Sequence, residues 1–171
     1  MIKRILCWIP VILMLVSLCG CTSKQKIKNP VLFYYPKTNI TYGGTEQVIQ
    51  SEPRESFGKE NNWRYLLEEY LHGPISDQLQ SPFPPRLEIV TLSFTPDTLT
   101  LVLSKSITYL SAADLTIACT SLALTCMDMT GVKVVKIQAD NVLLNGRRTI
   151  EINRDSVQHL DLACQNSSAG G

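Results

Sequence analysis

Residues 111–131 read SAADLTIACTSLALTCMDMTG, and this stretch decides the fold. Ser111 and Asp114 have the spacing of a capping box, with Asp in place of the usual Glu or Gln, so a helix should begin here. Apolar side chains then recur at steps of four and three residues, at Leu115, Cys119, Leu122, Cys126 and Met129. Gly131 ends the pattern. We therefore expect a long helix between Ser111 and Gly131 whose apolar stripe packs on a sheet.

Strand-like segments flank this helix on both sides. They are the apolar and β-branched runs Leu87–Phe94, Leu99–Ser104, Val132–Ala139 and Thr149–Ile152. Between the first two, Pro96 and Asp97 have the chemistry of a tight turn, which predicts an antiparallel hairpin. Asn145-Gly146 is a turn signal between the last two strands.

The first half of the chain adds a strand and a second helix. Val31–Tyr35 predicts a strand, and Gln47–Gln50 predicts a brief one. A helix over about residues 60–72 is predicted from apolar side chains on one face, at Trp63, Leu66, Leu67, Tyr70 and Leu71. Gly73 and Pro74 end it. The sequence thus predicts an α+β domain at residues 30–155, with one small antiparallel or mixed sheet and two helices packed on one face.

The segment between the first helix and the hairpin is rich in proline. Pro82, Pro84 and Pro85 surround Phe83, and prolines this dense favour a stiff, extended segment. We expect Phe83, Pro84 and Pro85 to form part of a surface that contacts a partner. The alternative is that Phe83 packs beneath the loop as a core residue.

The start of the chain has the features of an export signal. Lys3 and Arg4 precede an uncharged apolar run from Ile5 to Leu18. This run is shorter than the roughly 20 apolar residues of a membrane-spanning helix, and it fits the apolar region of a secretory signal. Residues 1–20 are therefore predicted to be a signal peptide, and residues 21–29 a flexible tether. The chain is expected to end in a flexible tail at residues 156–171.

The end of the signal, Leu18-Cys19-Gly20-Cys21, resembles the lipobox of bacterial lipoproteins. The resemblance implies a diacylglycerol linked to Cys21 through a thioether, with cleavage between Gly20 and Cys21. Each buried methylene of an acyl chain such as palmitate contributes about 0.8 kcal/mol, so two or three chains would anchor the protein to the extracytoplasmic face of the cell membrane. The alternatives are an ordinary cleaved signal and an uncleaved anchor.

Composition and motifs give no signature of catalysis or metal binding. A formal charge of +1 provides no basic field for nucleic acid, and 44% apolar residues predict a folded chain. His72 and His159 have no cysteine or carboxylate at metal-ligand spacing, and there is no phosphate loop or nucleophile elbow. Cys119 and Cys126 are expected to be buried, and Cys164 is either a free thiol or an intermolecular link. We expect no enzyme activity, metal or cofactor.

Three stretches resemble the GerMN domain family of sporulation and spore-germination proteins. They are Trp63–Pro74, then Leu99–Ser104 leading into the helix capped at Ser111, and Val132–Gln138 followed by Asn145-Gly146. The most specific is Leu71-His72-Gly73-Pro74, which matches the family's Leu-x-Gly-Pro helix ending.

This resemblance implies a small noncatalytic module, similar in fold to the ring-building motifs of secretion systems, on the outer face of a Gram-positive membrane. It would assemble with envelope or sporulation proteins, or with copies of itself, as a scaffold in sporulation or germination. The rival hypothesis is a lipoprotein that binds a solute or glycan. A deep apolar pocket with converging polar groups would favour the rival, whereas an exposed sheet edge or apolar patch would favour assembly.

Overall fold

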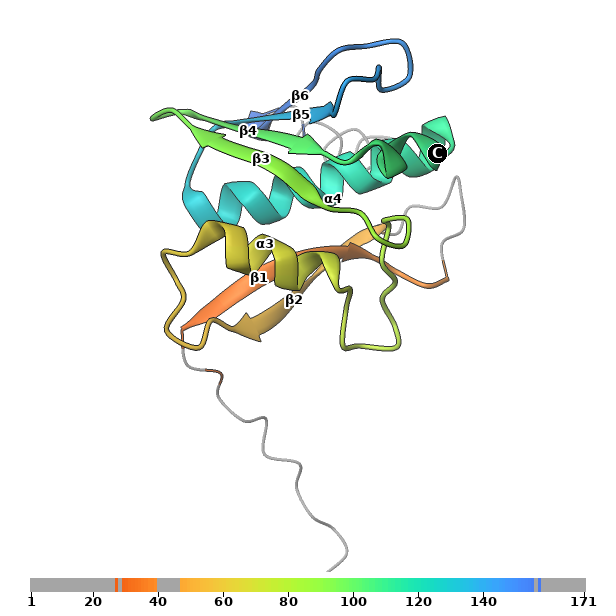
Figure 1. The fold of residues 1–171 in the computed structure, drawn as a ribbon. Coiled ribbons are helices and arrows are strands. Elements are labelled where there is room, and N and C mark those ends of the chain that lie inside the picture. Colours follow the sequence, from red (N-terminus) through yellow and green to blue (C-terminus); the bar gives the residue numbers. More distant parts are fainter. Residues whose placement is uncertain (1–26, 28, 40–46, 156, 158–171) are drawn as a thin grey trace, which may run out of the picture.

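Two sheets and two α-helices make up the part of the chain that the structure describes (Figure 1). The computed structural model describes residues 27, 29–39, 47–155 and 157. In chain order the elements are β1 (Pro30–Pro36), β2 (Ile49–Glu55), α3 (Trp63–Leu71), β3 (Ile89–Phe94), β4 (Thr98–Leu103), the 3₁₀ helix η1 (Lys105–Tyr109), α4 (Ala112–Thr130), β5 (Val134–Ala139) and β6 (Ile150–Asn153). The predicted α+β fold is confirmed.

The larger sheet has four strands in the order β3-β4-β5-β6. The pair β3–β4 is the predicted antiparallel hairpin, and β5–β6 is also antiparallel. The central pair β4–β5 is parallel, with Thr98 beside Val134 and Leu103 beside Ala139. Parallel neighbours need a crossover between them, and α4 provides it. Of the two arrangements that the sequence left open, the sheet is therefore the mixed one.

Strand β1 belongs to a second sheet, whereas the sequence predicted only one. β1 pairs antiparallel with β2, and α4 lies between this pair and the four-stranded sheet (Figure 1). The other edge of β1 faces α4. There the Tyr34 amide donates a hydrogen bond to Thr125 Oγ1 of α4 at 2.9 Å. Pro53 is accommodated in β2 because β2 is an edge strand.

Helix α4 begins and ends as the sequence predicts. Ser111 Oγ accepts the Asp114 amide at 3.2 Å and donates to the Asp114 carboxylate at 2.6 Å. Gly131 ends the helix with φ 79°, a left-handed conformation that favours glycine. Leu122, midway along the helix, is 1% exposed. Within the described part of the chain, α4 alone is long and apolar enough to cross a membrane, yet here it is the core helix between two sheets.

An aromatic cluster joins β1 to α3, which begins at Trp63 behind the capping residue Asn62. The rings of Tyr35 and Tyr70 stack with centroids 4.8 Å apart, and Phe33 meets Tyr70 edge-on at 5.4 Å. Both phenols are satisfied, because the Tyr35 hydroxyl donates to the carbonyl of Tyr70 and the Tyr70 hydroxyl to the carbonyl of residue 34, each at 2.7 Å. Buried tyrosines need such partners, so this cluster holds the two elements in a defined register.

Candidate functional site

Side chains that could hold a metal ion do not gather into a group in the described residues. Among them, no three His, Cys, Asp or Glu side chains lie close enough to share a metal ion. Cys119 and Cys126 are buried free thiols, as the sequence predicts. Burial raises the pKa of Cys119 to about 12 and also raises the pKa of Cys126. Neither thiol is therefore ionised to a nucleophile near neutral pH.

Tyr34, Asp128 and Arg154 form a tie between β1, α4 and the end of β6. The Tyr34 hydroxyl donates to Asp128 Oδ2 at 2.5 Å, and Arg154 Nη2 donates to Asp128 Oδ1 at 3.2 Å. Burial, and then the hydrogen bond to Asp128, raise the pKa of Tyr34 to about 12. The phenol therefore stays protonated and acts as a donor. Because each group is engaged by another element of the fold, the tie is structural.

Glu52 of β2 is a buried carboxylate that holds the loop after α3. It accepts the amide of Ser76 at 2.8 Å, the amide of Ile75 at 3.1 Å and the side chain of Arg54. Burial raises the pKa of this carboxyl, but the hydrogen bonds outweigh burial and hold the pKa below its usual range. Glu52 is therefore a charged anchor for the loop.

The loop between β5 and β6 stands out from the four-stranded sheet (Figure 1). A bridge between Ala139 and Val142 closes its first turn. Its second turn is the predicted Asn145-Gly146, with φ 48° and 78°, and this prediction is confirmed. Leu144 lies between the two turns and is fully buried. The loop is thus closed at both turns and anchored to the core.

This anchored loop presents an apolar patch beside the outer face of the sheet. We call it the loop patch and define it as Val102 of β4 with Val142 and Leu143 of the loop. Val142 is 39% exposed and Leu143 55% exposed. An open hollow of about 510 Å³ lies here, lined by Val102, Gln138, Ala139, Asp140, Asn141, Val142, Leu143 and Arg148. Exposed apolar side chains with a polar rim are typical of a protein interaction site.

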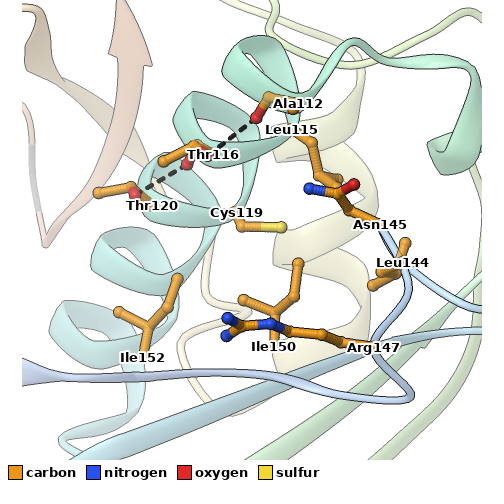
Figure 2. A pocket seen from close by; sticks show the side chains of 10 residues that line it. All are labelled: Ala112, Leu115, Thr116, Cys119, Thr120, Leu144, Asn145, Arg147, Ile150 and Ile152. Carbon is orange, nitrogen blue, oxygen red and sulfur yellow. Dashed lines mark hydrogen bonds between the residues drawn. The ribbon is translucent and has the colours of Figure 1, made fainter.

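A second hollow, which we call the β6 groove, lies between the first half of α4 and β6 and has a volume of about 320 Å³ (Figure 2). Its lining is mainly apolar and comprises Ala112, Leu115, Thr116, Cys119, Thr120, Leu144, Asn145, Arg147, Ile150 and Ile152. The hydroxyls of Thr116 and Thr120 donate back to carbonyls of α4, at 2.9 and 2.8 Å. Those two donors are therefore occupied by the helix itself.

The structure places Phe83 in the core. It is 9% exposed, and its ring meets Tyr70 edge-on with centroids 5.4 Å apart. The alternative that the sequence left open therefore holds for Phe83, because the ring fills space beside Tyr70 and is not available to a partner. Pro84 is half-buried and Pro85 exposed, so contact of these two with a partner stays a prediction. Cys21 lies outside the described residues, and its lipidation also stays a prediction.

Sequence reasoning missed Val142 and Leu143. The available signal is the run of Val142, Leu143 and Leu144 between two asparagines. A tight turn on each side cannot bury three consecutive apolar side chains, and only Leu144 reaches the core. The run of three apolar residues therefore predicts exposed side chains only when the turns before and after it have been identified.

Comparison with known proteins places these features in a family. A model of the family Germane, described as sporulation and spore germination, matches residues 32–145, two thirds of the chain. The structure of the tandem GerMN domains of the sporulation protein GerM from Bacillus subtilis is similar, with a TM-score of 0.56, 18% identity, and coverage of 79% of this chain and 49% of that one. This chain therefore spans about half the length of the tandem. A lipoprotein structure from Clostridium perfringens matches with a TM-score of 0.48 and 16% identity, over 74% of this chain and 88% of that one. No curated protein sequence matches.

Proposed function

The chain belongs to the Germane family of sporulation and spore-germination domains, and from this premise we propose that it is a noncatalytic scaffold of the cell envelope that binds a protein partner through the loop patch. We propose further that a diacylglycerol on Cys21 tethers it to the extracytoplasmic face of the membrane. The partner is an envelope or sporulation protein with a complementary apolar surface, and a second copy of this chain is the other candidate.

The observation that carries this proposal is the exposure of Leu143 on an anchored loop. Its neighbour Leu144 is fully buried and fixes the loop to the core. The side chain of Leu143 is therefore held at the surface, where a partner can contact it. Burying a leucine side chain contributes about 1.5–3 kcal/mol, which makes it a suitable anchor for an interface. The charged rim residues Asp140 and Arg148 offer groups that can orient a partner.

Solute or glycan binding has less support. Both hollows are open, and the hydroxyls of Thr116 and Thr120 in the β6 groove are occupied by the helix. A small-molecule site is instead expected to bring several free polar groups together in a concave pocket.

The test is a crosslinked pull-down of the tagged full chain from membranes of sporulating and vegetative cells, comparing Leu143→Glu with Phe57→Glu. Phe57 is a matched control, because it is 73% exposed and lies between β2 and α3, outside the loop patch. Both variants should keep the melting temperature of the parent. Only Leu143→Glu should lose the crosslinked partner, because it places a charge in the apolar contact.

Equal recovery of the partner by the two variants would contradict the proposal. A crosslinked product of twice the protein's own mass would identify the partner as a second copy. Turnover of cell-wall fragments by the purified protein, lost on a single substitution, would overturn the noncatalytic function.

A further inference from the structure

A tight turn between β2 and α3 presents an aromatic side chain to solvent. The turn is closed by the Lys59 amide, which donates to the Ser56 carbonyl at 2.9 Å. Phe57 and Gly58 lie between these two residues, with φ angles of 51° and 75°. The Ser56 hydroxyl donates to Glu60 Oε1 at 2.7 Å, which fixes the turn to the start of the next segment. Phe57 is 73% exposed in this closed turn.

The backbone of Phe57 is unusual for so large a side chain. A positive φ is uncommon in residues other than glycine, and it is an outlier for a bulky residue. Exposure of the ring adds a second cost, because apolar surface is unfavourable in water. An outlier of this kind points to a function for the residue outside the packing of the domain itself.

The turn lies where the chain enters the domain from its predicted tether. Asn29 Nδ2, one residue before β1, donates to Glu60 Oε1 at 3.0 Å. Figure 1 shows the start of β1 and the loop between β2 and α3 at the same end of the molecule. Residues 21–29 span at most about 30 Å, whatever their conformation. A lipid on Cys21 therefore keeps this turn close to the membrane surface.

Given the diacylglycerol proposed for Cys21, we propose that the turn with Phe57 and Lys59 is a second membrane contact, which enters the lipid headgroup region beside the anchor. Aromatic side chains accompanied by lysine are typical of protein segments that lie in this interface. Attachment at two points fixes the orientation of the domain, whereas a single tether leaves the domain free to rotate.

The charge around the turn favours anionic lipid headgroups. Residues 21–31 and 55–62 together contain four lysines and two carboxylates. One of the carboxylates, that of Glu60, already accepts two hydrogen bonds from within the domain. Lys59 is exposed, and its Nζ lies 5.6 Å from the centre of the Tyr65 ring, which holds the ammonium group beside the turn. Lysines at this position are attracted to an anionic membrane surface.

Contact through this turn places the loop patch away from the membrane. The loop between β5 and β6 stands on the other side of the molecule from the start of β1 (Figure 1). A partner therefore meets Leu143 on the side remote from the lipid. Phe57→Glu keeps the lipid on Cys21 and leaves the loop patch unaltered, so it remains a control for partner binding.

The test measures quenching of tryptophan fluorescence by brominated lipids, with the lipidated protein in phosphatidylglycerol vesicles. After cleavage at Cys21 the chain contains one tryptophan, Trp63, and Trp63→Phe provides a background without this reporter. In that background, Phe57→Trp places the reporter in the turn. Tyr109→Trp is the matched control, because Tyr109 is 78% exposed and ends η1, which follows the other sheet's strand β4. Brominated lipids should quench the emission of Phe57→Trp and leave that of Tyr109→Trp unchanged.

The outcomes separate this contact from the anchor itself. Equal quenching of the two reporters, or quenching of neither, in protein whose mass shows the lipid on Cys21 would overturn the membrane contact and leave the anchor standing. A mass without the lipid would overturn the anchor and, with it, the proposed orientation.

A second comparison tests the contribution of charge. Lys59→Glu, added to the Phe57→Trp protein, should weaken the quenching in phosphatidylglycerol vesicles more than in phosphatidylcholine vesicles, because only the former are anionic. The melting temperature should be the same with and without Lys59→Glu. Equal loss of quenching in the two kinds of vesicle would overturn the attraction to anionic headgroups.

Discussion

Glu52 shows how one side chain holds together segments that are distant in sequence. Its carboxylate lies on β2 but accepts the amides of Ile75 and Ser76, which follow α3. Hydrogen bonds that favour the charged form hold its pKa below the usual value of 4.5, despite burial. The unfolded chain therefore binds this proton more readily than the folded chain does, which links stability to pH.

We predict that Glu52→Gln lowers the free energy of unfolding by about 1.5–3 kcal/mol at neutral pH, since it removes hydrogen bonds to a charged acceptor. The contribution of Glu52 is complete above pH 4.5 and is lost as the pH falls through its lower folded pKa. The difference in the free energy of unfolding between Glu52→Gln and the parent, measured with urea, should therefore become smaller as the pH is lowered. Glu55→Gln, an exposed position on the same strand, should show no such gap. A gap that does not change with pH would exclude ionisation of Glu52 as the cause.

Substitution of Phe83 tests whether its ring packs in the core or is free to contact a partner. We predict that Phe83→Ala lowers the free energy of unfolding by about 3–5 kcal/mol, because it leaves a cavity beside Tyr70. Pro85→Ala, at an exposed position in the same loop, should change it by no more than about 1 kcal/mol, the effect of a proline on the unfolded chain. Denaturant unfolding measures both. Unchanged stability of Phe83→Ala would show that the ring does not pack in the core.

At the scale of elements, α4 was predictable because its signals are local. Its cap, its apolar period and the terminal Gly131 all lie within one stretch of sequence. Pairing of strands is different, because it depends on partners far along the chain. The spacing of apolar residues within a strand does not reveal its partner. It therefore could not predict that β4 and β5 are parallel or that β1 and β2 form a separate sheet. The loop patch could not be predicted for the same reason, since it joins Val102 to a loop that begins beyond β5.

Leu122 tests the central position of α4 in the core. We predict that Leu122→Ala costs about 2–5 kcal/mol, because the side chain is 1% exposed between the two sheets. Leu124→Ala, two residues along and half-buried, should cost clearly less. The comparison requires denaturant midpoints of both variants. Equal losses would mean that the helix is rotated relative to the described packing.

For the whole molecule, the predicted lipid anchor on Cys21 sets where the protein lies in the cell. We predict that Cys21→Ser abolishes lipidation and leaves a precursor with its signal attached, whereas Cys19→Ser remains lipidated, because a lipobox accepts a small residue at that position. Intact mass spectrometry of membrane-extracted protein distinguishes the two. An unmodified Cys21 in the parent protein, or a mature chain that begins elsewhere, would contradict the prediction.

The contact between β1 and α4 also constrains the time at which this domain can be completed during synthesis. The Tyr34 amide and its acceptor on Thr125 are 91 residues apart, and Phe33 and Tyr35 belong to the core that α4 helps to close. A two-stranded sheet is marginal by itself in water, and although α3 packs on β1, the core around Phe33 and Tyr35 also needs α4, which leaves the ribosome much later. The hydrophobic core can therefore be completed only after most of the chain has been made. Such a delay would suit the export that the predicted signal peptide implies, because a chain must be unfolded to be threaded across a membrane.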